Sequence, residues 1–555
     1  MFKLLKLIRG DRVKAYRPTV MATNGAVTTP HYLASQAGMK ILQIGGNAIH
    51  AAISIAATLG VVYPHMNGLG GDNFWLFYNA KTKELKGINA SGRSGEMADI
   101  AYYHQLGYDT IPERGYLAAN TVPGALSGWL KAYEYAESDM EQTMNWSELL
   151  EDAIEYAENG FPITDSQIKM AKSFLAKEAS NEERTNNDFY SIFIEPLLHC
   201  KGAGQLFYQK DLANTLRAIA KDKGHSFYHG DIAAKMVEMC QSQHGVLTKQ
   251  DLANHTADWM EPIAVDYRGY KAYNLPPNTQ GIASLSILNM INQFDLSEIK
   301  NDAFYYHLIV EATKLAFEDR DRWVTDPEYT MPPIDQLLSK QYGQQLAEVI
   351  ENKEEAGTFT ALLDPRGDTV WFGVVDKWGN AVSMIQSIYH EYGAAVVPPE
   401  TGVLLQNRGS FFSLDEEAIN RLEPKKRTFH TLNPAMLFKN NRPHLVYGTM
   451  GGEGQPQTQA ALVTRIIDYK YGVQEAIEAP RWLYGRTWGA SSNTLKLEKR
   501  IDPSVQAMLR KKGHDIELVE SYSDMMGHAG AILIDDENIK LAGSDPRSDG
   551  IALGY

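Results

Sequence analysis

The spacing of apolar residues divides this chain into a helical first part and a strand-rich last part. Residues 29–63 have apolar side chains at helical spacing, broken by Gly-Gly-Asn, which predicts a pair of helices. Residues 65–90 are typical of a loop followed by a strand hairpin. From residue 120 to 323 the pattern is mostly that of amphipathic helix, interrupted by the turn LPPNTQG.

Beyond a charged stretch at 351–368, which we interpret as an exposed linker, the pattern changes. Runs of β-branched and aromatic residues, bounded by Gly, Asn and Asp, now predict strands: TVWFGVVD, AVSMIQSIY, HLVYGTM and AGAILIDD. The first run follows Asp368 and begins with Thr369, although a buried strand needs neither residue there. Threonine is common in strands, so this residue alone indicates little. A chain cut before Thr369, however, would carry a hydroxyl and a new α-amino group on one residue.

Composition narrows the class of protein. With 555 residues, 44% hydrophobic and 22% charged, the chain resembles an ordinary globular protein of one large layered domain or several domains. The net charge of -15, without basic clusters interleaved with aromatic residues, argues against nucleic-acid binding. The two cysteines cannot form a disulfide framework and fit a reducing compartment. The N-terminus does not resemble a signal peptide, and the apolar stretch 51–64 is too short to cross a membrane, so we expect a cytoplasmic protein without membrane contact.

Short motifs exclude several kinds of site. The chain has no HExxH, CxxC, EF-hand or GxSxG motif, and we expect neither a metal nor a cofactor. The glycine-rich loop at 68–72 precedes a predicted strand rather than a helix, so it favours a close backbone approach over phosphate binding. Arg93 lies in a Gly/Ser turn, where a solvated arginine is the ordinary interpretation.

Eight ordered stretches spread over nearly the whole chain resemble the γ-glutamyltranspeptidase family of N-terminal nucleophile hydrolases. They are LASQAGMKILQIGGNAIHAAISIAATLGVVYP, GLGGDNFW, TVPGALSGW, YRGYKAYNLPPNTQG, DTVWFGVVDKWGNAVS, TGVLLQNRGSFFS, YGTMGGEGQPQ and GSDPRSDGIALGY. The resemblance implies an α/β (α+β) fold, the four-layer αββα sandwich with two packed antiparallel sheets. It also implies one proenzyme that is cut into a large part, residues 1–368, and a small part, residues 369–555, which together form one domain.

The family's catalytic residues map onto this sequence one by one. Thr369 matches the nucleophile, which would first attack the carbonyl of Asp368 and so release its own α-amino group as the base. Gly451 and Gly452 match the backbone donors to the oxyanion, and Ser387 matches a second hydroxyl beside the nucleophile. Arg93 matches the arginine that binds the substrate carboxylate.

The family's γ-glutamyl pocket is largely replaced here. Phe411 stands where γ-glutamyl enzymes have an acid for the substrate ammonium, and Arg408 lies nearby. Tyr389 replaces an asparagine, and His430 and Thr431 replace a pair of serines. We therefore expect these five residues to line the substrate pocket. An apolar ring cannot pair with an ammonium group, and an unpaired buried charge costs several kcal/mol.

These replacements resemble the oxamate amidohydrolase branch of the family, which implies hydrolysis of a short carboxylate-bearing amide to an acid and ammonia. A γ-glutamyltransferase or glutathione hydrolase is the first alternative, and an amidase for larger acyl groups is the second. A binding or scaffold protein that is not cut is the third. The expected partners are a small amide substrate and the two parts of the cut chain, with a homodimer of these left open.

Overall fold

The structure, a computed structural model, describes most of the chain. The described residues are 15–177, 188–298, 302–352, 355–357, 367–485 and 492–555. The expectation that the N-terminus is not a signal peptide falls on residues 1–14 and lies outside this range, as does most of the predicted linker at 351–368.

Two seven-stranded antiparallel sheets lie face to face at the centre of the molecule. In strand order, the first sheet consists of β1 (Val20–Ala22), β18 (Lys540–Ser544), β17 (Ala529–Ile534), β13 (Arg442–Thr449), β12 (Ala435–Lys439), β9 (Tyr270–Asn274) and β8 (Ile263–Tyr267). The second consists of β19 (Ile551–Gly554), β2 (Ala26–Thr29), β10 (Asp368–Val375), β11 (Ala381–Tyr389), β3 (Asp72–Asn79), β4 (Glu84–Ala90) and β7 (Asp258–Met260). Residues from both ends of the chain therefore pair within each sheet.

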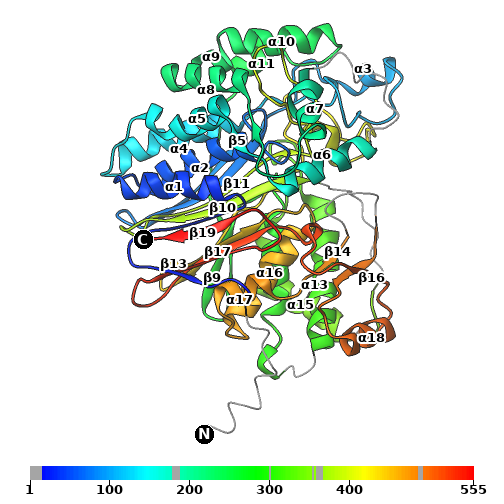
Figure 1. The fold of residues 1–555 in the computed structure, drawn as a ribbon. Helices are drawn as coiled ribbons and strands as arrows, with labels where there is room; N and C mark the ends of the chain where they lie inside the picture. Colours follow the sequence, from blue (N-terminus) through cyan, green and yellow to red (C-terminus); the bar gives the residue numbers. More distant parts are fainter. Residues whose placement is uncertain (1–14, 178–187, 299–301, 353–354, 358–366, 486–491) are drawn as a thin grey trace.

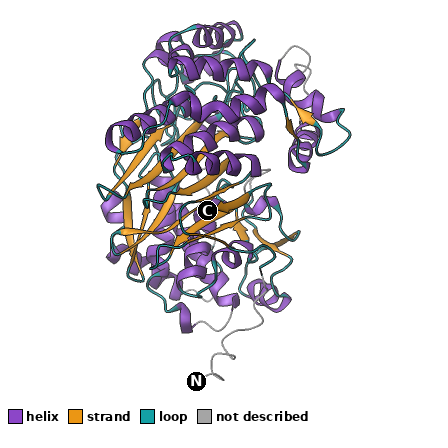
Figure 2. Ribbon diagram, turned by 60° about the vertical axis from the view of Figure 1, so that its left-hand side comes forward, coloured by secondary structure: helices purple, strands orange, loops and turns teal. Residues whose placement is uncertain are grey.

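Helices cover both outer faces of the sheet pair, so the strands run between two helical layers (Figures 1 and 2). The layer over the second sheet includes α1 (Tyr32–Gln43), α2 (Ala48–Val62), α4 (Ala125–Asp139), α5 (Glu151–Asn159) and α8 (Lys210–Asp222). The layer below the first sheet includes α12 (Gly281–Ile291), α13 (Asp302–Trp323), α15 (Lys340–Glu351), α16 (Gly454–Ile467) and α17 (Val473–Glu478). This is the predicted four-layer αββα order.

Shorter elements extend these layers at the edges. The helices are α3 (Ile100–Gln105), α6 (Asp165–Lys177), α7 (Glu195–Leu198), α9 (His225–Tyr228), α10 (Asp231–Ser242), α11 (Lys249–Ala253), α14 (Ile334–Leu337) and α18 (Pro503–Lys511). Two small sheets are formed by β5 (Phe161–Pro162) with β6 (Leu206–Phe207), and by β14 (Trp482–Tyr484), β15 (Leu495–Glu498) and β16 (Ile516–Val519).

The central strands are buried on both faces, which explains their continuous apolar sequences. All eight residues of β10 and all nine of β11 are buried. The layer between the sheets contains Trp371, which packs where Gly448 and Gly530 leave room. A Cβ at Gly448 would lie 2.3 Å from the indole nitrogen of Trp371, so glycine is required for this packing.

The structure confirms most of the predicted elements and corrects two. The helix pair at 29–63 and the hairpin at 65–90 are present as α1, α2, β3 and β4. The middle region, which the pattern predicted to be helical, also contains the strands β7, β8 and β9. A two-residue turn at Arg268 and Gly269, both with positive φ, connects β8 and β9. The Arg-Gly pair was the available sequence signal for this hairpin. The expectation of an exposed linker is wrong at its end, because Gly367 and Asp368 are buried where β10 begins.

Two further expectations concern the apolar helix and the cysteines. The apolar stretch at 51–64 lies within and just after α2, whose residues are all buried in the domain. Among the described residues no helix is both long and apolar enough to cross a membrane. Cys200 and Cys240 are both free thiols, as their number suggested.

Candidate active site

Thr369 lies at an irregularity at the start of β10. The register between β10 and β11 shifts between Asp368 and Val370, so Thr369 falls at a β-bulge, a feature that often reorients a side chain next to an active site. The residue is completely buried, and its Oγ1 has no hydrogen-bond partner among the described residues. A buried hydroxyl without a partner is uncommon and marks a position where another group is expected to bind or react.

Ser387 on β11 contacts Asp368, the residue before Thr369. Its Oγ donates a short hydrogen bond to the carbonyl oxygen of Asp368 and accepts one from the backbone N–H of Tyr389 at 2.8 Å. A hydroxyl that donates a hydrogen bond to a carbonyl oxygen polarises that carbonyl group. A Cβ atom added to Gly71 would lie 2.2 Å from the carbonyl oxygen of Ser387, which confirms that the glycine-rich loop at 68–72 permits a close backbone approach.

The Asp368 side chain is enclosed as completely as its carbonyl. Burial, followed by the charge of Glu391, raises the pKa of this carboxyl well above its usual range, while Lys177 and Arg114 oppose the shift. The side chain therefore favours its neutral form.

Gly451 and Gly452 form a tight turn at the N-terminus of α16. Both have positive φ, 122° and 51°, and Gly454 N–H donates to the carbonyl of Gly451 at 2.7 Å. Gln280 braces the turn from the other part of the chain, because its Nε2 donates to the carbonyls of Gly452 at 2.9 Å and Thr431 at 2.8 Å. Backbone N–H groups at a helix N-terminus are suited to stabilise a negatively charged oxygen.

Arg408 is a buried cation that forms no ion pair with any other described residue. Its exposure is 1%, and its Nε and Nη1 lack hydrogen-bond partners among the described residues. Nη2 donates a long hydrogen bond of 3.4 Å to Thr431 Oγ1, and the guanidinium carbon lies 3.8 Å from the ring centroid of Tyr389. Burial lowers the pKa of Arg408 to about 10, so the group is still charged at neutral pH. Unused donors on a buried cation favour binding of an anion.

The other residues predicted for the pocket surround this arginine. Tyr389 has a positive φ of 81° and contacts Phe411 edge to face, with 6.1 Å between ring centroids. His430 Nε2 lies 3.3 Å from Asp72 Oδ2, and burial, together with the charge of Arg408, lowers the pKa of His430 well below its usual range. The structure thus brings together the predicted group of Arg408, Tyr389, Phe411, His430 and Thr431.

Arg93 has a different environment. Its guanidinium donates to Asp326 at 3.3 Å, to Glu328 at 2.6 Å and to the carbonyl of Lys425 at 3.2 Å. Its side chain is 27% exposed, and no contact among the described residues joins it to Thr369 or Arg408. A substrate carboxylate at Arg93 would have to compete with these acids, whereas Arg408 has donors to spare.

Two site residues were not singled out from the sequence. Asp72 is fully buried, and burial raises the pKa of its carboxyl group to about 6, although hydrogen bonds from Gln406 and from the N–H of Gly92 act to lower this pKa. Gln280 links the turn at Gly452 to Thr431. Both lie inside quoted motifs, GLGGD and LPPNTQG, and a polar residue that ends a glycine- or proline-rich loop was the available signal.

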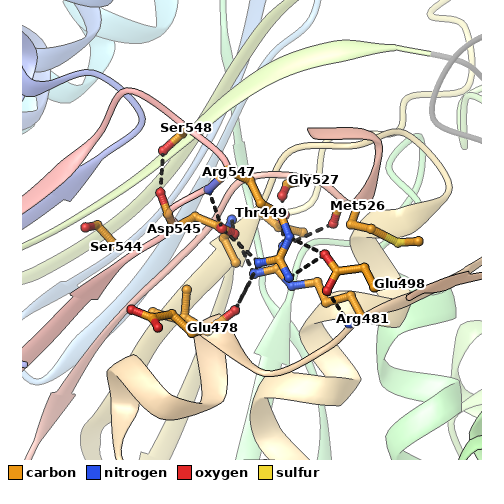
Figure 3. Close-up of polar contacts among 12 residues, drawn as sticks. Thr449, Glu478, Arg481, Glu498, Met526, Gly527, Ser544, Asp545, Arg547 and Ser548 are labelled. Carbon is orange, nitrogen blue, oxygen red and sulfur yellow. Dashed lines mark hydrogen bonds and ion pairs between the residues drawn. The ribbon is translucent and has the colours of Figure 1, made fainter. Parts of the chain in front are cut away.

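A buried ionic network supports the segment next to the Gly451 turn (Figure 3). Arg481 donates to the carbonyls of Met526 and Gly527 at 3.0 and 2.8 Å and pairs with Asp545 at 2.5 Å. Arg547 pairs with the same aspartate at 2.9 Å. Although burial opposes it, the charge of both arginines keeps the pKa of Asp545 below its usual range. The network fixes the backbone that leads from residue 526 to β17.

One group of side chains in the described structure has the composition of a metal site. His307, Glu311 and His514 offer ligand atoms within 4.8 Å of one another. Several of their polar atoms already take part in hydrogen bonds. His307 Nδ1 lies 2.8 Å from His514 Nε2, and Glu311 accepts from Lys314 Nζ at 2.6 Å and from Gly357 N–H at 2.9 Å. We describe this group as a hydrogen-bonded connection between α13, residue 357 and the segment after α18.

Comparison with known proteins agrees with this architecture. The γ-glutamyltranspeptidase family model matches residues 34–555. The chain is 44% identical to the glutathione hydrolase-like YwrD proenzyme of Bacillus subtilis, covering 97% of this chain and 99% of that protein. It is also 44% identical to the oxamate amidohydrolase proenzyme of Klebsiella pneumoniae, covering 96% and 99%. The crystal structure of a cephalosporin acylase from Bacillus halodurans superposes with a TM-score of 0.89 at 35% identity, covering 99% of this chain and 98% of that one.

The fold and the enclosed threonine define an enzyme of the N-terminal nucleophile hydrolase class, with two antiparallel sheets between helical layers. The chain belongs to the γ-glutamyltranspeptidase family. Its activity is accordingly that of an amidohydrolase, and the sequence-based assignment to this family is confirmed.

Proposed function

We propose that this protein cuts itself before Thr369 and then hydrolyses a small amide whose carboxylate lies close to the scissile bond, with oxamate as the model substrate. The observation that carries the proposal is Arg408, a buried guanidinium with two nitrogens that lack partners among the described residues. A planar fork of donors suits a carboxylate. The ring of Tyr389 lies against it and contacts Phe411, and neither ring supplies a carboxylate for a substrate ammonium group.

Self-cleavage follows from the contacts of Thr369. Its Oγ1 attacks the carbonyl carbon of Asp368, which Ser387 polarises. The C–N bond breaks as the ester forms, and the hydroxyl proton ends on the new α-amino group of Thr369. Water then hydrolyses the ester and gives a carboxylic acid at Asp368 and a free Thr369. Residues 1–368 and 369–555 remain interleaved, because each sheet contains strands from both parts.

The same threonine then acts on the substrate. Its α-amino group, with a reference pKa of about 7.7–8.0, takes the hydroxyl proton as Oγ1 attacks the amide carbon. The N–H groups of the Gly451–Gly452 turn stabilise the oxyanion, and ammonia leaves with a proton from the α-ammonium group. Water hydrolyses the acyl-threonine and completes the cycle. In this proposal, residues of the chain and water carry out both the acylation and the deacylation of Thr369.

A γ-glutamyl substrate is the second candidate, since the relative named glutathione hydrolase-like is as similar as the oxamate enzyme. Its donor carries an α-ammonium group that needs an acid. Asp72 is a buried acid that interacts electrostatically with Arg408, but its oxygens already face Gly92, Gln406 and His430. This engagement favours the substrate without an ammonium group.

We expect fully processed enzyme to release ammonia from oxamate with a larger kcat/KM than it releases aniline from a γ-glutamyl anilide. The difference should be about 10²-fold or more, since one unpaired buried charge costs several kcal/mol. The variant Phe411→Asp supplies the missing acid and should shift the ratio toward the anilide. A wild-type preference for the anilide would instead place the γ-glutamyl function first.

Replacing Gly451 with alanine should lower kcat much more than it changes KM. Its φ of 122° is a region that side chains avoid, so alanine would rotate the N–H that faces the oxyanion. Loss of one such donor costs about 10²–10³ in kcat. Steady-state kinetics on processed protein measures this, with the melting temperature as the control for folding. An unchanged kcat would remove this turn from the mechanism.

A further inference from the structure

A group of buried aromatic side chains lies beside the cleavage site and has no part in the chemistry above. We call it the histidine chamber: His31, Tyr63, His65, Tyr392 and His528. The rings of Tyr63 and His65 are 4.3 Å apart between centroids, and Tyr63 lies 5.8 Å from His31 and 6.5 Å from His528. Tyr392 closes the group at 6.2 Å from His65. The members come from segments far apart in the chain.

The chamber is polar but mostly without hydrogen bonds. Both ring nitrogens of His65, both of His528 and the hydroxyl of Tyr392 lack partners among the described residues, although none of these residues is more than 4% exposed. Each buried polar atom without a partner costs about 1–3 kcal/mol, so such atoms normally bind internal water. A small cavity lined by His528, Trp371 and Thr28 adjoins the chamber at its His528 end.

The chamber is connected to the cleavage site by electrostatic contacts and to the oxyanion turn by a backbone hydrogen bond. Asp368 interacts electrostatically with the hydroxyl groups of both Tyr63 and Tyr392, whose pKa values are raised mainly by burial. On one side, the N–H of Tyr392 donates to the carbonyl of His65 at 2.9 Å. On the other, the carbonyl of His528 accepts from the N–H of Met450 at 3.3 Å, one residue before Gly451. The ionic network of Arg481 fixes the neighbouring residues 526 and 527.

The histidine rings of the chamber can bind water without placing a charge in the protein interior. Burial lowers the pKa of His65 to about 3, and burial lowers that of His528 as well, so both rings are neutral at physiological pH. A neutral imidazole has one donor and one acceptor, as water requires. Thr369 itself is completely buried in the uncut chain, so water for the ester has to be present inside the protein.

We propose that the histidine chamber holds the water that hydrolyses the Asp368–Thr369 ester during self-cleavage. The inference rests on the self-cleavage described above and assigns its second step. Water adds to the ester carbonyl of Asp368, and the bond to Thr369 Oγ1 breaks. One proton of the water returns to Oγ1, and its oxygen remains in the new carboxyl group. His65 and His528 position the water and are not themselves consumed.

The test is to empty the chamber and look for the trapped ester. His65→Leu and His528→Leu should each slow self-cleavage on the order of 10²-fold, because the water is no longer positioned. The uncut chain should then contain an ester. After denaturation, hydroxylamine should split it at residue 368 and leave a hydroxamate on Asp368, which mass spectrometry identifies. His65→Gln keeps the hydrogen bonding and should restore most of the cleavage rate.

His50→Leu is the matched control, because His50 is equally buried but lies at the other end of α2. We expect this variant to lose stability without accumulating ester. Cleavage of both chamber variants at the wild-type rate would overturn the inference, and so would slow cleavage without a hydroxylamine-sensitive ester. A wild-type chain that never splits would overturn self-cleavage itself, which distinguishes failure of the proposed function from failure of the chamber.

Discussion

Replacing Thr369 with alanine should leave a single chain of 61.9 kDa that releases no ammonia from any amide. Alanine removes the Oγ1 that attacks Asp368, so the ester cannot form and the α-amino group stays in a peptide bond. Loss of a nucleophile of this kind typically costs on the order of 10⁶ in kcat. The two measurements are the intact mass after long incubation and the rate of ammonia release from oxamate.

Thr369→Ser is the matched control, since it keeps the hydroxyl and removes one buried methyl group. We expect it to split, more slowly than wild type, and to keep measurable activity, with a stability loss of about 1 kcal/mol. An alanine variant that splits at the same bond would mean that another residue starts self-cleavage. An alanine variant that hydrolyses oxamate without splitting would place the catalytic nucleophile elsewhere.

The layers of this fold could be predicted from the sequence because their signals are local or lie in long motifs. The helix pair α1 and α2 has clear helical spacing, and β10 and β11 have the continuous apolar runs of strands buried on both faces. The strands β8 and β9 were missed between helical segments, because five-residue strands carry little periodic signal. Which strands pair was beyond any local pattern, since β2 pairs with both β10 and β19.

The candidate site, like the fold, could be predicted only in part from the sequence. Motif comparison selected Thr369, Ser387 and Arg408 as site residues, and the structure places Ser387 against Asp368 and Arg408 against Tyr389. It did not reveal that Arg93 is paired with Asp326 and Glu328, because those acids lie more than 200 residues away in sequence. The histidine chamber was equally hidden. Most of its members are far apart in the sequence, and the polar atoms that lack partners among the described residues can be identified only once burial is known.

Replacing Arg408 with glutamine should make the protein more stable and less active at the same time. A buried charge without an ion pair is costly, and the lowered pKa of about 10, against 12.5, corresponds to roughly 3 kcal/mol at neutral pH. The direction follows from linkage between protonation and folding. At a pH below the pKa of Arg408 in both the folded and the unfolded state, the arginine is charged in both states, and burial of its charge lowers the free energy of unfolding by the full amount. Glutamine removes the charge, so the melting temperature should rise. The kcat/KM for oxamate should fall by about 10² or more, because the substrate carboxylate loses its cation.

Arg93→Gln separates this interpretation from the one based on family resemblance. Its guanidinium is 27% exposed and satisfied by acids, so its replacement should change the melting temperature little and should not raise it. If Arg408 binds the carboxylate, oxamate should raise the melting temperature of processed Arg93→Gln but not of processed Arg408→Gln. The opposite pattern would place the carboxylate at Arg93 and leave Arg408 as a packing partner of Tyr389. Because each variant is compared with and without oxamate, the stability gained by removing a buried charge does not obscure the loss of binding.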